Sequence, residues 1–178
     1  MKPITKCLLL ATLVVGVAFA SAQNVQVNST NTSPLRLKIQ LTDSWHQLKN
    51  TDGPATFYRL KSDSPLQVSW AEYRGKQLLR KVTPDELKNA ASNFGQKQGF
   101  GDLIESSNGD CKFGHFGTAT FRSVEHPHIQ VWFVTDGTDN ILVTYICSKV
   151  PEPIEVQETR EIAKTVALSR ETSDAPKK

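Results

Sequence analysis

Apolar residues occupy alternate positions from Leu35 to Leu41, and polar residues occupy the positions between them. A period of two places all the apolar side chains on one face of a strand, so residues 35–42 predict a strand with one buried face. Shorter runs separated by turn residues predict further strands over residues 55–61, 66–73, 102–106, 111–113, 116–122, 129–135 and 141–148. The last two are joined through Asp136-Gly137 as a hairpin.

A helix start is the sharpest local signal in the chain. Residues 83–86 read Thr-Pro-Asp-Glu, which combines an N-cap threonine, a proline at the first helical position and a glutamate that completes a capping box. Apolar residues then recur at helical spacing from Leu87 to Phe94, and Gly99 is suited to end the helix.

A second helix is predicted from Ile154 to about Leu168, directly after Pro151-Glu152-Pro153. Its buried stripe contains Thr159, Ile162, Ala163 and Val166, and its charged residues, among them Glu155 and Glu158, are expected to face solvent. Runs of antiparallel strands interrupted by only two helices predict an α+β fold, mostly antiparallel sheet packed by two helices.

The first 22 residues have the pattern of a secretory signal peptide. Lys2 and Lys6 precede an apolar run over residues 8–20, and Ala20-Ser21-Ala22 offers a small-residue cleavage site. As a helix the run spans about 20 Å, short of the roughly 30 Å hydrocarbon core, so no stable membrane insertion is expected. We therefore expect a secreted or periplasmic protein.

The chain that remains divides into three parts. Residues 23–34 are rich in Asn, Ser and Thr and are expected to form a flexible segment. Residues 35–168 form the single α+β domain, and residues 169–178 form a disordered tail. The mature chain has 19 basic and 18 acidic residues, so it lacks the strongly basic character of a nucleic-acid-binding protein.

Cys111 and Cys147 are the cysteines of the mature chain. A pair of cysteines in an oxidising compartment usually forms a disulfide, so a bridge is expected. In a plain three-stranded meander the two would lie at opposite ends of the sheet, too far apart to bond. The bridge therefore requires a bend or crossover around residues 114–117.

Three histidines could serve a metal-dependent or hydrolytic enzyme. His126 and His128 flank a proline, Glu125 is adjacent, and His115 is a candidate third ligand. The alternative interpretation is a polar turn between two strands. The sequence contains no Gly-x-Ser-x-Gly, His-Glu-x-x-His or Cys-x-x-Cys motif. The prediction is a non-catalytic protein without a metal or cofactor, and the histidine-based enzyme is kept as the alternative.

A candidate interaction surface lies on the strand over residues 129–135. If Ile129, Val131 and Phe133 face inward, Trp132 faces the other way together with His128 and Gln130. Trp132 is then an exposed anchor for a partner, unless the second helix or a loop covers that face.

Several landmarks together resemble the PsbP-like family, which includes extrinsic photosystem proteins and periplasmic DcrB-type relatives. They are the Leu37-Lys38-Ile39-Gln40-Leu41 strand followed by Ser44-Trp45, the Thr83 helix start with Leu87, the 131–143 hairpin, and Thr144-Tyr145 before the last helix. The resemblance covers about residues 35–168.

The resemblance implies a secreted or lumenal domain with an accessory or binding role, and it carries no catalytic residues. The chain departs from the family pattern at Thr42-Asp43-Ser44-Trp45, where members often have Pro-x-Gly-Trp. The expected partner is an envelope or secreted protein, and an immunity-type protein that neutralises its partner is a third hypothesis.

Overall fold

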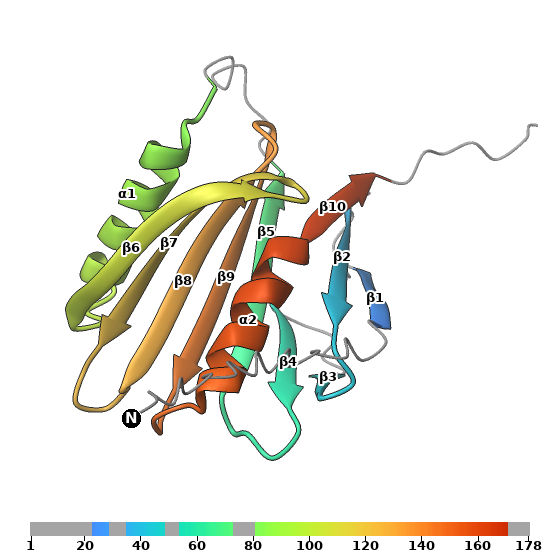
Figure 1. Ribbon diagram of the computed structural model, residues 1–178. Helices are drawn as coiled ribbons and strands as arrows, with labels where there is room; N and C mark the ends of the chain where they lie inside the picture. Colours follow the sequence, from blue (N-terminus) through green and yellow to red (C-terminus); the bar gives the residue numbers. More distant parts are fainter. Residues whose placement is uncertain (1–22, 29–34, 49–53, 73–80, 171–178) are drawn as a thin grey trace, which may run out of the picture.

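The computed structural model describes residues 23–28, 35–48, 54–72 and 81–170, which form two antiparallel sheets and two helices (Figure 1). The predicted leader and residues 171–178 of the predicted tail lie outside the described residues. The larger sheet has the order β3-β4-β5-β9-β8-β7-β6. Its strands are β3 (Trp45–Leu48), β4 (Ala55–Arg59), β5 (Pro65–Glu72), β6 (Asp102–Cys111), β7 (Gly114–Arg122), β8 (His128–Thr135) and β9 (Asp139–Cys147).

The smaller sheet has the order β1-β2-β10, with β1 (Gln23–Asn28), β2 (Leu35–Leu41) and β10 (Ala167–Arg170). The helices are α1 (Pro84–Lys97) and α2 (Pro153–Thr165). Two helices packed on a mostly antiparallel sheet make this an α+β protein, so the predicted fold class is confirmed.

Helix α1 begins where the sequence predicts. The Thr83 hydroxyl accepts a hydrogen bond from the Glu86 backbone N–H, and the Glu86 carboxylate accepts one from the Thr83 backbone N–H at 2.9 Å. This reciprocal pair satisfies two backbone donors at the helix start. The helix covers one face of the larger sheet at β6, β7 and β8 (Figure 1).

Two glycines allow α1 to approach the sheet closely. A Cβ atom added to Gly117 on β7 would lie 2.0 Å from the backbone nitrogen of Lys88, and one added to Gly95 would lie 2.2 Å from the Phe121 ring. No real Cβ atom makes contacts this short, so larger residues would push the helix away from the strands.

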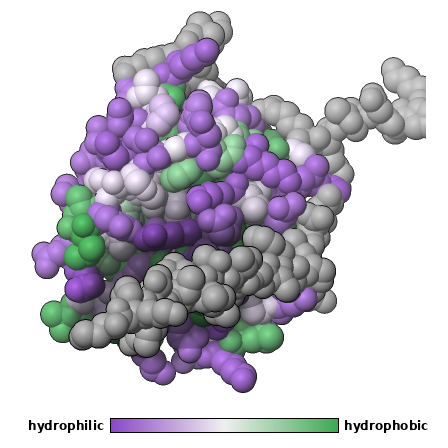
Figure 2. Space-filling view, in the orientation of Figure 1, coloured by the Kyte–Doolittle hydropathy of each residue, from purple (hydrophilic) through white to green (hydrophobic). Residues whose placement is uncertain are grey.

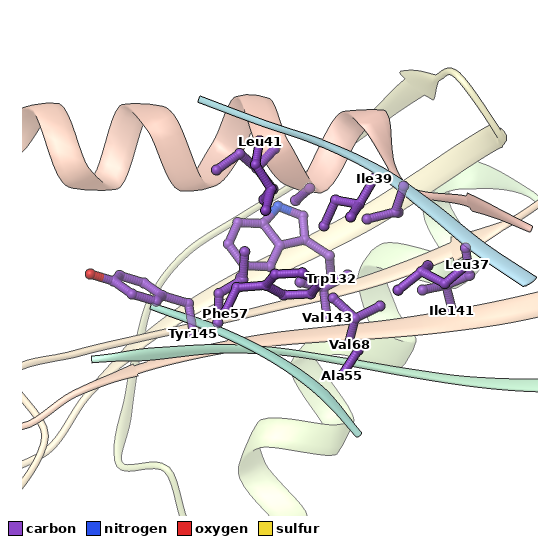
Figure 3. Close-up of a cluster of buried hydrophobic side chains, with 14 of the residues drawn as sticks. Leu37, Ile39, Leu41, Ala55, Phe57, Val68, Trp132, Ile141, Val143 and Tyr145 are labelled. Carbon is purple, nitrogen blue, oxygen red and sulfur yellow. The ribbon is translucent and has the colours of Figure 1, made fainter. Parts of the chain in front are cut away.

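The opposite face of the sheet carries the larger core. Helix α2 and strand β2 cover it, and Figure 3 shows Trp132 packed between Leu41 and Ile39 on one side and Val143 on the other. The apolar side chains of β2 are almost fully buried here, as the period-two pattern predicts. Burial of this many apolar side chains supplies the main stabilisation of the fold.

The smaller sheet corrects two boundary predictions. Residues 23–28, expected to be part of a flexible segment, form strand β1, which pairs with β2 from Gln23↔Leu41 to Asn28↔Arg36. The second helix ends at Thr165 rather than Leu168, and β10 follows it, so Ser169 and Arg170 belong to a strand rather than the tail. Both strands gain backbone hydrogen bonds from β2, which offset the entropy cost of ordering them.

Residues 111–113 were predicted as a separate strand, and this is wrong. Cys111 is instead the last residue of β6, which pairs along its length with β7 through a hairpin at Lys112 and Phe113. The Lys112 backbone N–H donates to the Lys164 carbonyl at 3.2 Å. The hairpin therefore reaches the C-terminal end of α2.

Candidate functional site

A polar pocket of about 450 Å³ lies at the end of the sheet where the β4–β5 turn meets the β9–α2 loop. This volume lies within the range of ordinary ligand pockets. The lining is mostly charged or polar and is formed by Arg59, Lys61, Ser62, Asp63, Ser64, Ser148, Lys149, Val150, Pro151, Glu152 and Glu155. Such a lining suits a charged or polar ligand group better than an apolar molecule.

Arg59 is anchored on one side of the pocket by α2. Its Nε donates to the Glu158 carboxylate at 2.8 Å, and its guanidinium lies 3.8 Å from Glu152. Glu158 also accepts hydrogen bonds from Trp45 Nε1 at 3.0 Å and from the Ser44 hydroxyl at 3.2 Å. The hydrogen bond and charge of Glu158 raise the pKa of Arg59 above its ordinary value. This network joins the β2–β3 turn, β4 and α2.

Glu155 lies in the first turn of α2 and is only 5% exposed. Its Oε1 atom accepts hydrogen bonds from the Ser62 hydroxyl at 2.5 Å and from the Tyr145 hydroxyl. Burial is the largest cause that raises the pKa of Tyr145 far above its ordinary value, and the bond to Glu155 adds to it. Tyr145 is therefore a permanent hydrogen-bond donor to Glu155.

Cys147 ends β9 next to this cluster, and its thiol is buried. Desolvation raises its pKa, although Tyr145 and Ser64 oppose the shift through hydrogen bonds. Desolvation likewise raises the pKa of the half-buried Cys111 thiol. Both cysteines consequently remain protonated thiols rather than reactive thiolates.

The predicted disulfide between Cys111 and Cys147 is wrong, because both cysteines are free. Cys147 pairs with His128 at the start of β8. Cys111 pairs with Gly114, and the next residue, His115, pairs with Thr135 at the end of β8. At about 3.3 Å per residue, the eight residues of β8 separate the two ends by roughly 23 Å. The uninterrupted β6–β7 hairpin supplies no crossover that would bring the cysteines together.

The predicted interaction residues also face the interior. Trp132 is 2% exposed and Gln130 is 1% exposed, while His128 is half-buried. The alternative of a covered face is correct, because α2 and β2 pack over this side of the sheet. Trp132 is a core residue and provides no exposed anchor.

His128 lies against the edge of the Tyr145 ring, with 6.0 Å between the ring centroids. Desolvation lowers its pKa below the ordinary 6.5, and the charge of Arg160 adds to this effect. The described residues contain no hydrogen-bond partner for the buried His128 Nε2 or for the buried Gln130 Oε1.

The structure does not bring the three candidate histidines together. His115 pairs with Thr135 at one end of β8, whereas His128 begins β8 at the other end, and His126 lies in the turn just before it. His115 Nδ1 instead lies 2.6 Å from Asp110 Oδ1. Across the ranges that the structure describes, no group of three or more His, Cys, Asp or Glu side chains could hold a metal ion.

The pocket residues were missed in the sequence because Glu155 and Glu158 were assigned to the solvent side of the second helix. A signal for Glu155 was present: it lies four residues before Thr159 and therefore continues the buried stripe. Arg59, Ser62 and Tyr145 had no local signal, because they meet Glu155 and Glu158 only through long-range packing.

Comparisons with known proteins do not name a family. No family model matches the chain, and no curated protein matches it. One similar solved structure is a crystal structure of a protein from Bacteroides thetaiotaomicron VPI-5482. The similarity covers 77% of this chain and 46% of that one, at 10% identity and a TM-score of 0.39.

No described helix combines the length and the apolar character needed to cross a membrane.

Proposed function

We propose that this chain is an exported, non-catalytic binding protein of the PsbP-like type, with a protein of the envelope or the secreted medium as its partner. Its contact surface is the pocket end of the molecule. The observation that carries the proposal is a charged pocket with exposed apolar residues at its rim. Val150 lines the pocket and is 81% exposed, and Leu60 and Ile154, which adjoin lining residues in the chain, are also exposed.

The mixture of charged and exposed apolar side chains at the pocket end favours a protein partner over a small apolar ligand. Exposed apolar side chains next to charged groups are typical of surfaces that bind other proteins. Figure 2 shows hydrophobic patches along the lower edge of the molecule, the edge at which the β4–β5 turn lies in Figure 1.

A binding role rather than catalysis is supported by the state of the groups around the pocket. Cys147 is held as a thiol and Tyr145 as a phenol by their raised pKa values. Ser62 and Tyr145 both donate to Glu155, so their hydroxyls hold the second helix against the sheet. The resemblance to PsbP-like proteins, which implies an accessory or binding role, agrees with this assignment.

The decisive experiment is affinity capture with matched variants. The chain from Gln23 onward is immobilised and exposed to native envelope extract, and each retained protein is then purified and titrated against the chain. We expect one partner to bind the wild type and to lose at least tenfold in affinity against L60S and V150S. The control L48S changes an exposed leucine on β3, where it pairs with Thr56 rather than Arg59, and it should bind as the wild type does.

Equal binding by all three variants would show that the pocket end is not the contact surface. Turnover of a substrate by the purified chain would overturn the non-catalytic assignment. Cell fractionation tests the proposed export: a product that begins at Gln23 is expected outside the cytoplasm, and an unprocessed chain inside it would contradict the proposal.

A further inference from the structure

Glu155 is an unusual residue to find at the base of this pocket. It lines the pocket although the side chain is 95% shielded from solvent. A buried carboxylate is costly unless hydrogen bonds or an opposite charge compensate its desolvation. Its position in the first turn of α2 provides part of this compensation, because the helix dipole favours negative charge there.

The hydrogen bonds of Glu155 leave one of its oxygens unused. Ser62 and Tyr145 both donate to Oε1, and both donors are neutral. No described residue donates a hydrogen bond to Oε2. A carboxylate has room for about four hydrogen bonds, so Glu155 retains acceptor capacity on Oε2.

No cation in the described part of the chain lies within ion-pair distance of Glu155, although the charge of Arg59 acts on it from further away. The nearby guanidinium of Arg59 is committed to Glu158 at 2.8 Å, with Glu152 as its second partner at 3.8 Å. Lys149 lies 3.7 Å from Asp63, and both of these side chains are largely exposed. Glu155 is therefore the most deeply buried charge of the pocket lining, whereas the lysines stand at its rim.

We propose that Glu155 binds a cationic group, the ammonium of a lysine or the guanidinium of an arginine on the partner protein, through its free Oε2. The pocket is large enough for the end of such a side chain. The hydroxyl groups of Ser64 and Ser148 also line it and can accept hydrogen bonds from the same group. The lining contains three cationic and three anionic side chains, and the charge of Arg59 is paired with Glu158. The exposed rim lysines repel a cation only weakly, since exposed charges are screened by water and salt. This inference rests on the proposed function and adds which chemical group of the partner the pocket binds.

The test titrates the chain from Gln23 onward with the peptide acetyl-Gly-Lys-Gly-amide, monitored by amide chemical shifts in nuclear magnetic resonance. The same peptide with norleucine in place of lysine has the same aliphatic chain without the charge. A third peptide carries glutamate. We expect saturable shifts at Ser62, Ser64 and Ser148 with the lysine peptide and at least tenfold weaker binding of the other two.

E155Q keeps the size of the side chain and one oxygen that can accept from Ser62 and Tyr145, but it removes the charge and replaces the second oxygen by an NH2 donor. We expect at least a tenfold loss of affinity for the lysine peptide. The control E161Q changes a glutamate of the same helix that is 66% exposed and does not line the pocket, and it should stay within twofold of the wild type. If E155Q does not fold, the comparison of the three peptides on the wild-type chain still tests whether the pocket binds a cationic group.

Equal binding of the lysine and norleucine peptides, absence of saturable shifts, or full affinity in a folded E155Q protein would each overturn the inference. Failure here is distinguishable from failure of the proposed function. A partner that depends on Leu60 and Val150, with no preference for the lysine peptide, would refute cation recognition alone.

Discussion

His128 illustrates how a single buried side chain makes the molecule sensitive to pH. It lies half-buried beside Tyr145, and desolvation holds its pKa below 6.5 in the folded state. In the unfolded chain its pKa returns to the ordinary value. Between these two values the unfolded state binds more protons than the folded state, so the free energy of unfolding falls as the pH falls below about 6.5.

Replacing His128 tests this dependence of the free energy of unfolding on its protonation. In H128Q, the loss of unfolding free energy between pH 7.5 and pH 5 should be smaller than in the wild type, because the group that takes up the proton on unfolding is absent. Urea denaturation at several pH values measures it. The variant L48S, which changes an exposed side chain that does not titrate, provides the control and should retain the wild-type pH dependence. An unchanged slope in H128Q would refute the assignment.

Glu158 shows that one carboxylate can join several elements. Its oxygens accept hydrogen bonds from Ser44, Trp45 and Arg59, which lie before β3, in β3 and in β4. The pair with Arg59 is mostly shielded from solvent on both sides, at 20% and 18% side-chain exposure. Partly buried hydrogen bonds to a charged group are stronger than neutral ones.

The substitution E158Q should lower the free energy of unfolding by roughly 2–3 kcal/mol, because a charged acceptor of three donors is replaced by a neutral amide. Urea denaturation at pH 7 is the measurement. E161Q changes an exposed glutamate of the same helix whose partner is Lys164, and it should shift stability by no more than about 0.5 kcal/mol. A similar small shift in E158Q would mean that the network adds little.

At the scale of elements, the docking of α1 depends on the absence of side chains. Gly117 lies directly under the backbone of Leu87 and Lys88, and Gly95 faces the ring of Phe121. The capping box determines where α1 starts, but these two glycines determine how closely it approaches β7. Propensity alone would disfavour a glycine inside a helix or a strand.

The substitution G117A places a methyl group against the helix backbone, which cannot move as a flexible side chain can. We expect a loss of about 3 kcal/mol in the free energy of unfolding, measured by chemical denaturation. The control S106A changes an exposed position on neighbouring β6, and its effect should stay within about 0.5 kcal/mol. Wild-type stability in G117A would show that α1 tolerates a larger separation from the sheet.

At the scale of the whole molecule, the sheet keeps the two cysteines apart. They occur at opposite ends of the β6-to-β9 meander, and the fold is held by packing on both faces of the sheet instead of by a crosslink. An oxidising compartment favours a disulfide between two cysteines, but these two lie too far apart in the sheet to form one.

Reductant should therefore leave the stability of the chain from Gln23 onward unchanged. We expect the same thermal midpoint with and without dithiothreitol, and two reactive thiols per chain after denaturation in the absence of reductant. A bridge that closes a loop of this length would contribute about 3–4 kcal/mol. A midpoint that falls by several degrees on reduction would contradict the free-thiol assignment.

Local patterns predicted those features whose physical cause is itself local. The alternation from Leu35 to Leu41 and the capping box at Thr83 both appear in the structure where the sequence indicates. The boundaries of β1 and β10 were not predictable, because their order comes from pairing with β2 rather than from their own side chains. The pocket could not be predicted either, since it joins the β4–β5 turn to the start of α2.

The sequence by itself determined the α+β class, the strand that carries the apolar stripe and the start of α1, because each depends on periodicity or on contacts within a few residues. Only the tertiary structure decided that Trp132 is covered, that Cys111 and Cys147 stay apart and that Glu155 is buried. The physical reason is that burial and proximity depend on which element packs over which face, and residues far apart in the chain meet only through that packing.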